Sequence, residues 1–462
     1  MLGFGLWGLD RGGMWRDEAV TYQVARRSVP QIWRLLHGVD AVHGLYYLLM
    51  HAVLAVHPGE VVLRLPSVCA AAATAGLVAA LGARLARPRV GLWAGLLYAV
   101  SPMAGHYAQE GRSYALVAAG AAGATLLFVR AVQGDGSWWA YGVALGLTCW
   151  LHEFAVLLLL AHALTLVCAR AGAPVWRGWG CAATLVGLAL LPMAFVSHAQ
   201  SAQVAWLRRP TIETAQGLLR TFLGPTDGVY WACLALALVA LAGLVGRRGE
   251  VSCAGVALPL AVVPPLALML ASQMSPLYVD RYVLYALGGA PLLVAAGVDR
   301  VAGVLGRLLP SLPLTLTGVV AVLLAVVHQL PLLRDDRAPA HRPDDLAAVS
   351  LAAQRALRPG DPVLFLPGQT RNAALAYPEA FRGVRDLGLA VPAPESGTLY
   401  GREADAATLR GRTARLDRVW VVADPAVLTG RRPPRSPAER AELALLAEEF
   451  MPAREFAGPD AV

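Results

Sequence analysis

Residues 14–47 read MWRDEAVTYQVARRSVPQIWRLLHGVDAVHGLYY, and they form a polar, charged stretch in a chain that is otherwise mostly apolar. The stretch holds the acidic pair Asp17 and Glu18, followed by Asp40 and His43. Repeated apolar runs of about 18–20 residues follow it, which is typical of helices that cross a bilayer. We therefore expect a membrane scaffold that holds residues 14–47, as a loop, at one bilayer face.

The composition is that of an integral membrane protein. Of the 462 residues, 57% are hydrophobic and only 15% are charged, whereas soluble domains carry about 25% charged residues. The basic residues are all arginine, and the formal net charge is +8. In a membrane protein such an excess indicates cytoplasmic loops, and no run of alternating basic and aromatic residues indicates a nucleic-acid partner. The six cysteines form no CxxC pair, which favours packing in helices over a metal or redox site.

The apolar runs predict about ten membrane spans. Their approximate positions are residues 66–84, 90–107, 113–130, 138–151, 154–169, 180–197, 229–246, 254–272, 282–298 and 312–331. Arginine-bearing loops between them all fall on one side, which the positive-inside rule assigns to the cytoplasm. An even number of spans then places the opening loop and the tail together on the extracytoplasmic face of the plasma membrane.

Three further short segments lie near the N-terminus. Residues 1–9 are apolar but too short to cross a bilayer, so we interpret them as the outer end of a first helix whose beginning is missing. Residues 28–36 predict a short helix, and residues 45–56 predict an apolar helix that lies in the membrane interface.

The composition changes near residue 334, where Pro, Asp, Arg and Gly become frequent. We predict a membrane domain over residues 1–333, which includes the first loop over residues 10–60, and a soluble α/β domain over residues 334–462. In the soluble domain we expect a helix over 344–357, strands over 362–366 and 418–423, and a helix that begins at Ser436 with a capping box to Glu439. The predicted fold class is therefore an all-α polytopic membrane protein with a small C-terminal α/β domain.

Charged side chains beside a membrane core are costly, so their positions suggest function. Asp17 is the main candidate for a catalytic base, and Glu18 either shares this role or supports the loop; the alternative is a solvated surface pair. Asp40 and His43 could orient a hydroxyl group, or bind a divalent metal together with Glu110. The alternative for these two is a helix N-cap and a polar interfacial histidine, so the sequence leaves a metal ion undecided.

A second set of candidates lies between spans on the same predicted face. In the sequence HYAQEGRSY, Glu110 and Arg112 either form a structural ion pair, or Arg112 binds a phosphate group, with Tyr114 nearby. His152 and Glu153 interrupt an apolar region at this face. Arg281 and Tyr282 start a later span, where they either anchor headgroups or bind phosphate.

These motifs, in this order, resemble a known family. The segments WRDEAVTY (15–22), DAVHGLYYLL (40–49), YAQEGRSYAL (107–116), LHEFAVLLLL (151–160) and DRYVLYALGGAP (280–291) resemble the C-type (GT-C) glycosyltransferases that use polyprenyl-phosphate sugars. The similarity is to the bacterial branch related to dolichyl-phosphate-mannose protein mannosyltransferases, and it covers about residues 1–330. Gly44 stands where many members have proline.

The resemblance implies a helical membrane enzyme with an extracytoplasmic active site and a sugar donor on polyprenyl phosphate. The family's catalytic aspartate corresponds to Asp17, its second acidic position to Glu18 or Asp40, and donor-phosphate binding to Arg112 or Arg281. We expect an inverting single displacement onto an acceptor hydroxyl of a protein, lipid or glycan, with mannose or another hexose or pentose as the sugar. The alternatives are a polytopic transporter or lipid-linked-sugar flippase, and an inactive scaffold whose tail recruits a partner.

Overall fold

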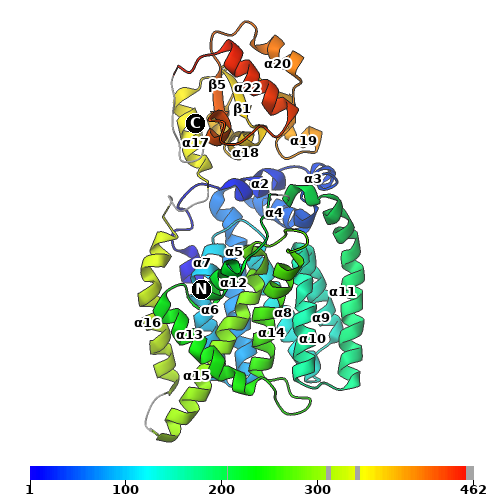
Figure 1. Ribbon diagram of the computed structural model, residues 1–462, viewed down its shortest axis with the longest axis vertical. Helices are drawn as coiled ribbons and strands as arrows, with labels where there is room; N and C mark the ends of the chain where they lie inside the picture. The colour runs from blue at the N-terminus through cyan, green and yellow to red at the C-terminus, as the bar shows by residue number, and fades with distance from the viewer. Residues whose placement is uncertain (205, 309–313, 339–343, 454–462) are drawn as a thin grey trace. The chain divides into compact units, whose positions relative to one another are not determined.

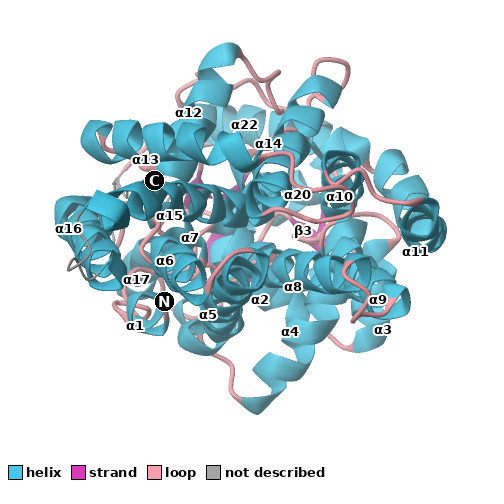
Figure 2. Cartoon of the chain, turned by 90° about the horizontal axis from the view of Figure 1, so that it is seen from below, coloured by secondary structure: helices cyan, strands magenta, loops and turns pink. Residues whose placement is uncertain are grey.

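The computed structural model describes residues 1–204, 206–308, 314–338 and 344–453 (Figure 1). Most of the described residues are helical, and the few strands are short (Figure 2). The chain divides into two compact units. Unit 1 comprises residues 1–9 and 64–336, and unit 2 comprises residues 10–63 and 337–462.

Unit 1 is built from apolar helices, several of which run side by side (Figure 1). They are α1 (Leu2–Leu6), α5 (Glu60–Leu85), α6 (Pro88–Ala99), α7 (Pro102–Tyr107), α8 (Tyr114–Val132), α9 (Trp138–Leu151), η2 (Glu153–Leu157), α10 (Leu158–Cys168), α11 (Ala173–Ala199), η3 (Ser201–Val204), α12 (Ile212–Leu223), α13 (Asp227–Ala240), η4 (Leu241–Gly243), α14 (Cys253–Ala271), η5 (Asp280–Gly288), α15 (Gly289–Leu308) and α16 (Leu314–Asp335). Each of the ten predicted spans overlaps one or two of these helices.

The length of these helices bears on how many times the chain crosses a membrane. Within the described ranges, six helices are long and apolar enough to cross a bilayer, and a seventh span results if α12 and α13–η4, which meet at 87°, count as one. The other predicted spans correspond to shorter helices such as α6 and α9. The multi-pass helical fold class is confirmed, and the count of ten spans stays a prediction.

The expected span over residues 90–107 is broken in two. Ser101 has an extended backbone conformation, and α7 begins at Pro102. Proline lacks an N–H group for a helical hydrogen bond and disfavours the helical conformation of the residue before it. The break therefore follows from Pro102, which the hydropathy pattern does not register, and it redirects the chain just before the HYAQEGRSY segment.

Unit 2 combines the helices of the opening stretch with the C-terminal α/β residues. The helices are α2 (Arg16–Ala25), α3 (Val29–Leu36), η1 (Ala41–His43), α4 (Gly44–Val56), α17 (Leu346–Ala356), η7 (Gly368–Arg371), α18 (Asn372–Ala376), η8 (Pro378–Phe381), α19 (Ala393–Ser396), α20 (Ala406–Thr413), α21 (Pro425–Leu428) and α22 (Pro437–Glu449). The strands are β1 (Pro362–Leu366), β2 (Arg385–Asp386), β3 (Leu389–Val391), β4 (Arg402–Glu403) and β5 (Trp420–Ala423).

The three strands β2, β1 and β5 form a parallel sheet in that order, and β3 pairs with β4 antiparallel. In the register of the parallel sheet, Val363 of β1 lies beside Trp420 of β5 and Leu366 beside Ala423. Val363 and Phe365 pack in one core cluster with α17, while Leu364 packs in another with α20 and α22. Burial on both faces explains why β1 is a continuous apolar run, as is usual for parallel strands.

The C-terminal helix α22 has the predicted cap in part. The Ser436 hydroxyl accepts a hydrogen bond from the backbone N–H of Glu439 at 3.1 Å. The Glu439 carboxylate, however, accepts from the N–H of Arg435 at 2.7 Å and not from that of Ser436. The helix start is therefore as predicted, and the second half of the capping box is shifted by one residue.

The opening stretch is tied to the C-terminal residues by hydrogen bonds inside unit 2. The N–H of Met14 donates to the Tyr377 hydroxyl at 2.8 Å. The Arg16 guanidinium donates to Asp344 at 2.8 Å. The sequence predicts residues 10–60 as part of the membrane domain, whereas in the structure residues 10–63 group with residues 337–462. Contacts between residues more than 300 positions apart produce this grouping, and no local pattern reports them.

Candidate functional site

A cluster of aromatic and basic side chains in unit 1 surrounds Tyr114, the first residue of α8. The Tyr114 ring centroid lies 5.9 Å from that of His152 and 6.1 Å from that of Tyr282. His152 follows the last residue of α9, and Tyr282 lies in η5. Three helix ends that are distant in the sequence therefore bring these predicted residues together.

Two arginines point at the same tyrosine ring. The guanidinium carbon of Arg112 lies 6.0 Å from the Tyr114 ring centroid, and that of Arg281 lies 5.9 Å from it. The Arg281 Nε–H also donates a hydrogen bond to the Tyr114 hydroxyl at 3.2 Å. Arginine presents a planar set of donors that suits phosphate oxygens, so this cluster has the chemistry of an anion site.

His152 is neutral in this cluster. Burial lowers the pKa of His152, and the charges of Arg112 and Arg281 lower it further, to about 3. A buried imidazole next to two cations loses its proton because a third positive charge would be unfavourable. The positive charge of the cluster therefore comes from the two arginines alone, and His152 can offer only a neutral N–H or a nitrogen lone pair.

The backbone of the segment that carries Arg112 is held by α5. The Ser67 hydroxyl donates to the backbone carbonyl of Glu110 at 2.6 Å, with a longer contact of 3.2 Å to that of Arg112. The Gln109 side chain donates to the carbonyls of Gly5 and Trp7. Ser67 was not predicted, because a single serine at the start of a span gives no functional signal in the sequence.

Glu110 and Glu153 have other neighbours. The Glu110 carboxylate lies 3.6 Å from His106 Nε2, and His106 Nδ1 lies 2.7 Å from the Asp336 carboxylate. Glu153 accepts a hydrogen bond from the Ser197 hydroxyl of α11 at 2.9 Å. His106 thus joins α7 to the residue after α16, and Glu153 joins η2 to α11.

The acidic pair of the opening stretch lies on a helix and not in the expected loop. Asp17 and Glu18 occupy the first turn of α2, where negative charge is favourable because helix N-termini carry partial positive charge. Glu18 is fully buried, whereas Asp17 is partly exposed. Of the pair, Asp17 thus has the carboxylate that a substrate can reach more readily.

Asp40 and His43 both lie next to Tyr47. Asp40 has a left-handed backbone conformation with φ of 56°, and its carboxylate accepts a hydrogen bond from the Tyr47 hydroxyl at 2.7 Å. The ring centroid of His43 lies 6.0 Å from that of Tyr47. Asp40 stands at the N-cap position of η1, without a side-chain capping hydrogen bond.

Tyr400, in the C-terminal part of unit 2, interacts electrostatically with this acidic group. Burial raises the pKa of the Tyr400 hydroxyl, and the negative charges of Asp40 and Asp17 raise it further. The backbone carbonyl of Tyr400 accepts a hydrogen bond from Arg371 at 2.8 Å. The C-terminal residues therefore contribute to the surroundings of both aspartates, which the sequence analysis missed because nothing near Tyr400 in the chain resembles a motif.

The metal ion considered from the sequence has no ready-made site. Among the residues that the structure describes, no three His, Cys, Asp or Glu side chains are grouped so that they could hold a metal ion. Asp40 and His43 belong to unit 2 and Glu110 to unit 1. The ligand set that the sequence suggests therefore stays a hypothesis.

Comparisons with known proteins agree with this architecture. Residues 44–197 match the family model described as dolichyl-phosphate-mannose-protein mannosyltransferase. The crystal structure of ArnT from Cupriavidus metallidurans in the apo state is similar over 93% of this chain and 92% of its own, with a TM-score of 0.60 and 14% identity. The same enzyme bound to undecaprenyl phosphate matches over 97% and 93%, with a TM-score of 0.58 and 14% identity.

The chain has the GT-C glycosyltransferase fold. The apo oligosaccharyltransferase of Archaeoglobus fulgidus is also similar, with a TM-score of 0.51 and 13% identity over 91% of this chain and 67% of the archaeal one. No curated protein sequence matches the chain. The GT-C fold confirms the resemblance seen in the motifs and the multi-pass membrane architecture.

Proposed function

We propose that this GT-C protein is a membrane glycosyltransferase that transfers a sugar from a polyprenyl-phosphate donor to an acceptor hydroxyl. The observation that carries the proposal is the convergence of Arg112 and Arg281 on Tyr114, beside the neutral His152. Two guanidinium groups match the charge of a phosphate monoester or diester. The matched family and ArnT, whose structure was solved with undecaprenyl phosphate, support a lipid-linked donor.

The proposed reaction is a single displacement. Asp17 takes the proton from the acceptor hydroxyl, and the acceptor oxygen forms a bond to the anomeric carbon of the sugar. The bond between that carbon and the phosphate oxygen breaks, and its electron pair leaves with the polyprenyl phosphate. Arg112 and Arg281 stabilise the negative charge that develops on the phosphate. The sugar therefore changes its anomeric configuration, and a mannosyltransferase specificity is part of the proposal through the family match.

Four further residues have roles in the proposed site, namely Glu18, Asp40, His43 and Tyr282. We propose that Asp40 and Glu18 support the acidic group around Asp17, and that His43 and Tyr282 line the donor and acceptor sites. We propose that the active-site residues and residues 334–462 face the extracytoplasmic side. The acceptor is a hydroxyl of a protein, lipid or glycan, and membrane lipids surround unit 1.

The experiment is transfer by the purified full chain in nanodiscs. Radiolabelled polyprenyl-phosphate sugars are offered beside nucleotide sugars, and release of polyprenyl phosphate is measured together with the anomeric configuration of the product. We expect turnover of a lipid-linked donor only, and at least about a thousandfold loss in Asp17→Asn because the general base is removed. Asp10→Asn, an exposed aspartate of the same unit, is the matched control.

Two outcomes would contradict the proposal. Normal turnover in Asp17→Asn would remove the assignment of the base. Movement of a lipid-linked sugar across the bilayer of vesicles, without release of polyprenyl phosphate, would identify the flippase alternative.

A further inference from the structure

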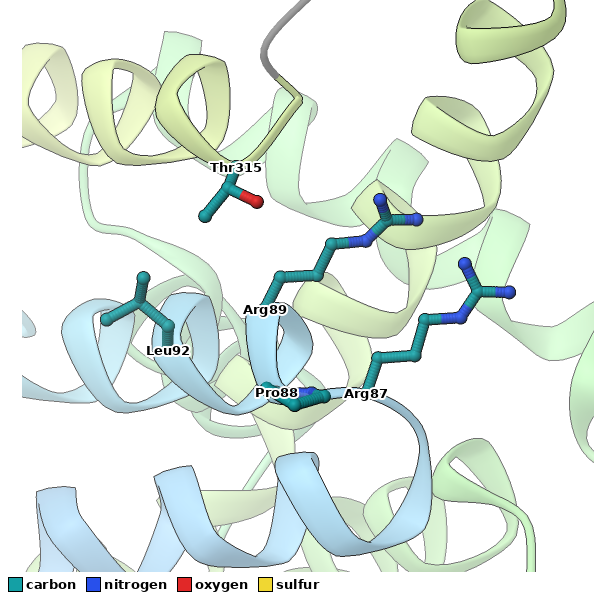
Figure 3. Close-up of a pocket in the computed structure, with 5 residues that line it drawn as sticks. All are labelled: Arg87, Pro88, Arg89, Leu92 and Thr315. Atoms are coloured by element: carbon teal, nitrogen blue, oxygen red, sulfur yellow. The ribbon is translucent and has the colours of Figure 1, made fainter.

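A second pair of arginines lines a cavity at the other end of unit 1. The cavity has a volume of about 470 Å³ and is lined by Arg87, Pro88, Arg89, Leu92 and Thr315 (Figure 3). Ser67, near the start of α5, contacts the Arg112 segment, and Arg87 follows the end of α5. From Ser67 to its end at Leu85, α5 rises about 27 Å, which is close to the thickness of the hydrocarbon core. The length of α5 is therefore sufficient to place this cavity and the Tyr114 cluster at opposite sides of a bilayer.

The two arginines share one carboxylate. Arg89 is 2.6 Å from Asp299, whereas Arg87 is 3.8 Å from the other oxygen of the same carboxylate. The Arg89 guanidinium also lies 5.8 Å from the ring centroid of Trp93. Arg89 is therefore held in place, and one unit of positive charge at the cavity is left without a matching negative charge among these three groups.

Arg87 is the side chain that a ligand can reach. Its side chain is 63% exposed, compared with 21% for Arg89 and 18% for Asp299. Figure 3 shows both arginine side chains extending in the same direction. The first turn of α6 begins at Pro88, and a helix N-terminus adds further positive potential for an anion. The polar side of the cavity thus has the chemistry of a phosphate site.

The other wall of the cavity is apolar. Leu92, on α6, is 43% exposed, and Pro88 lies beside the arginines in Figure 3. Thr315, in the first turn of α16, lies across the cavity from Arg89 and Leu92 (Figure 3). Its backbone carbonyl accepts a hydrogen bond from Trp93 at 3.2 Å. An inorganic anion would use only the polar half of this cavity, whereas a lipid would place its phosphate on the arginines and its first methylene groups on Leu92.

We propose that this cavity binds the phosphate group of an anionic membrane lipid, with Arg87 as the main contact and Arg89 as the oriented second one. The site is separate from the proposed donor site and does not depend on the proposed function. Arginine-rich loops mark the cytoplasmic side in membrane proteins, where anionic lipids attract basic side chains. Such a lipid would bridge α6 to the start of α16.

The test is native mass spectrometry of the purified full chain with phosphatidylglycerol or phosphatidylcholine added. We expect one phosphatidylglycerol molecule to be retained about fivefold more tightly than phosphatidylcholine, because charge-assisted hydrogen bonds favour the anionic headgroup. Arg87→Gln should abolish most of this preference without loss of folding, since its contact with Asp299 is long. Arg130→Gln, which removes an exposed arginine outside the cavity, is the matched control and should keep the preference.

A competition experiment distinguishes a lipid phosphate from free inorganic phosphate. Inorganic phosphate at millimolar concentration should not displace the bound phosphatidylglycerol; displacement would show a free-phosphate site and overturn the assignment to a lipid. Equal retention of the two lipids would overturn the proposal, and so would an equal loss of preference in Arg87→Gln and Arg130→Gln.

Discussion

At the scale of single residues, Arg281 gives a direct test of phosphate binding. Its Nε–H donates to Tyr114, and its guanidinium lies over the rings of Tyr114 and Tyr282. Arg281→Lys keeps the charge but loses the planar set of donors. We expect kcat/KM for the lipid-linked donor to fall about tenfold, which steady-state kinetics would measure. Arg248→Lys, at an exposed arginine, should change nothing; an unchanged kcat/KM in Arg281→Lys would argue against the phosphate role.

A second residue, Glu442 of α22, predicts how stability changes with pH. Its side chain is 2% exposed, and its Oε2 atom has no hydrogen-bond partner among the described residues. Burial and the nearby charge of Glu403 raise the pKa of Glu442 to about 8, whereas an unfolded glutamate titrates near 4.3. The folded state therefore binds more protons than the unfolded state between these pH values, and stability falls as pH rises from about 4.5 to 8.

Glu442→Gln removes the free-energy cost of ionising this buried carboxyl group while keeping the size of the side chain. We expect the variant to be more stable than wild type at pH 8, by at most about 4–5 kcal/mol, and little different at pH 4.5. Hydrogen exchange of the β1 and α22 peptides at the two pH values would measure it. Glu449→Gln, an exposed position of the same helix, is the control, and equal protection in all three proteins at pH 8 would contradict the prediction.

At the scale of elements, small residues let α5 and α6 approach closely. A Cβ atom on Gly91 would lie 2.3 Å from the backbone oxygen of Ala79, and one on Gly95 would lie 2.8 Å from the Ala79 Cβ. Gly91 and Gly95 have the spacing of the small-xxx-small pattern, which brings membrane helices together through close backbone contact. The same two helices lead to the Ser67–Arg112 contact at one end and to the arginine cavity at the other.

Gly91→Leu should separate this helix pair. We expect a loss of about 1–3 kcal/mol, as for overpacking of a close-packed core, seen as a lower midpoint of thermal aggregation in detergent. Gly76→Leu on α5 is the matched control, because a Cβ atom at Gly76 meets nothing within 4 Å. Equal aggregation midpoints for the two variants would show that the close approach contributes little.

At the scale of the whole molecule, the grouping of the opening stretch with the C-terminal residues changes what a truncation tests. Unit 2 contains α2 with Asp17, and the C-terminal residues hold α2 from several sides. Gln23 donates to the carbonyl of Leu399 at 2.8 Å, and Arg27 donates to that of Thr398 at 2.9 Å. Burial lowers the pKa of Arg27 only to about 10, so its charge is kept at neutral pH. The C-terminal residues are thus part of the structure around the proposed base and not an appended module.

Removal of residues 337–462 should therefore abolish transfer and expose α2 to hydrogen exchange. A milder change, Tyr377→Phe, removes the acceptor for the Met14 N–H and the hydrogen bond to Glu60, and we expect faster exchange over residues 14–25 with a fold still intact. Arg382→Gln, at an exposed position, is the control. Full transfer by the truncated chain would show that the opening stretch holds its structure alone.

The sequence by itself determined the elements of this protein. Each of the ten predicted spans overlaps one or two helices, and β1 covers residues 362–366 as expected, because hydrophobic runs and periodicity are local properties of the chain. The motifs also identified the GT-C fold, and they named Arg112, Tyr114, His152, Arg281 and Tyr282 one by one.

Only the tertiary structure decided which of these elements and residues meet. It gathered the other four residues around the Tyr114 ring, brought Tyr400 within the electrostatic influence of Asp17 and Asp40, and grouped residues 10–63 with the C-terminal residues. It also placed Asp17 and Glu18 on a helix instead of a loop. The physical reason is that these arrangements depend on side-chain packing and hydrogen bonds between residues far apart in the chain, and local propensity and hydropathy carry no record of such partners.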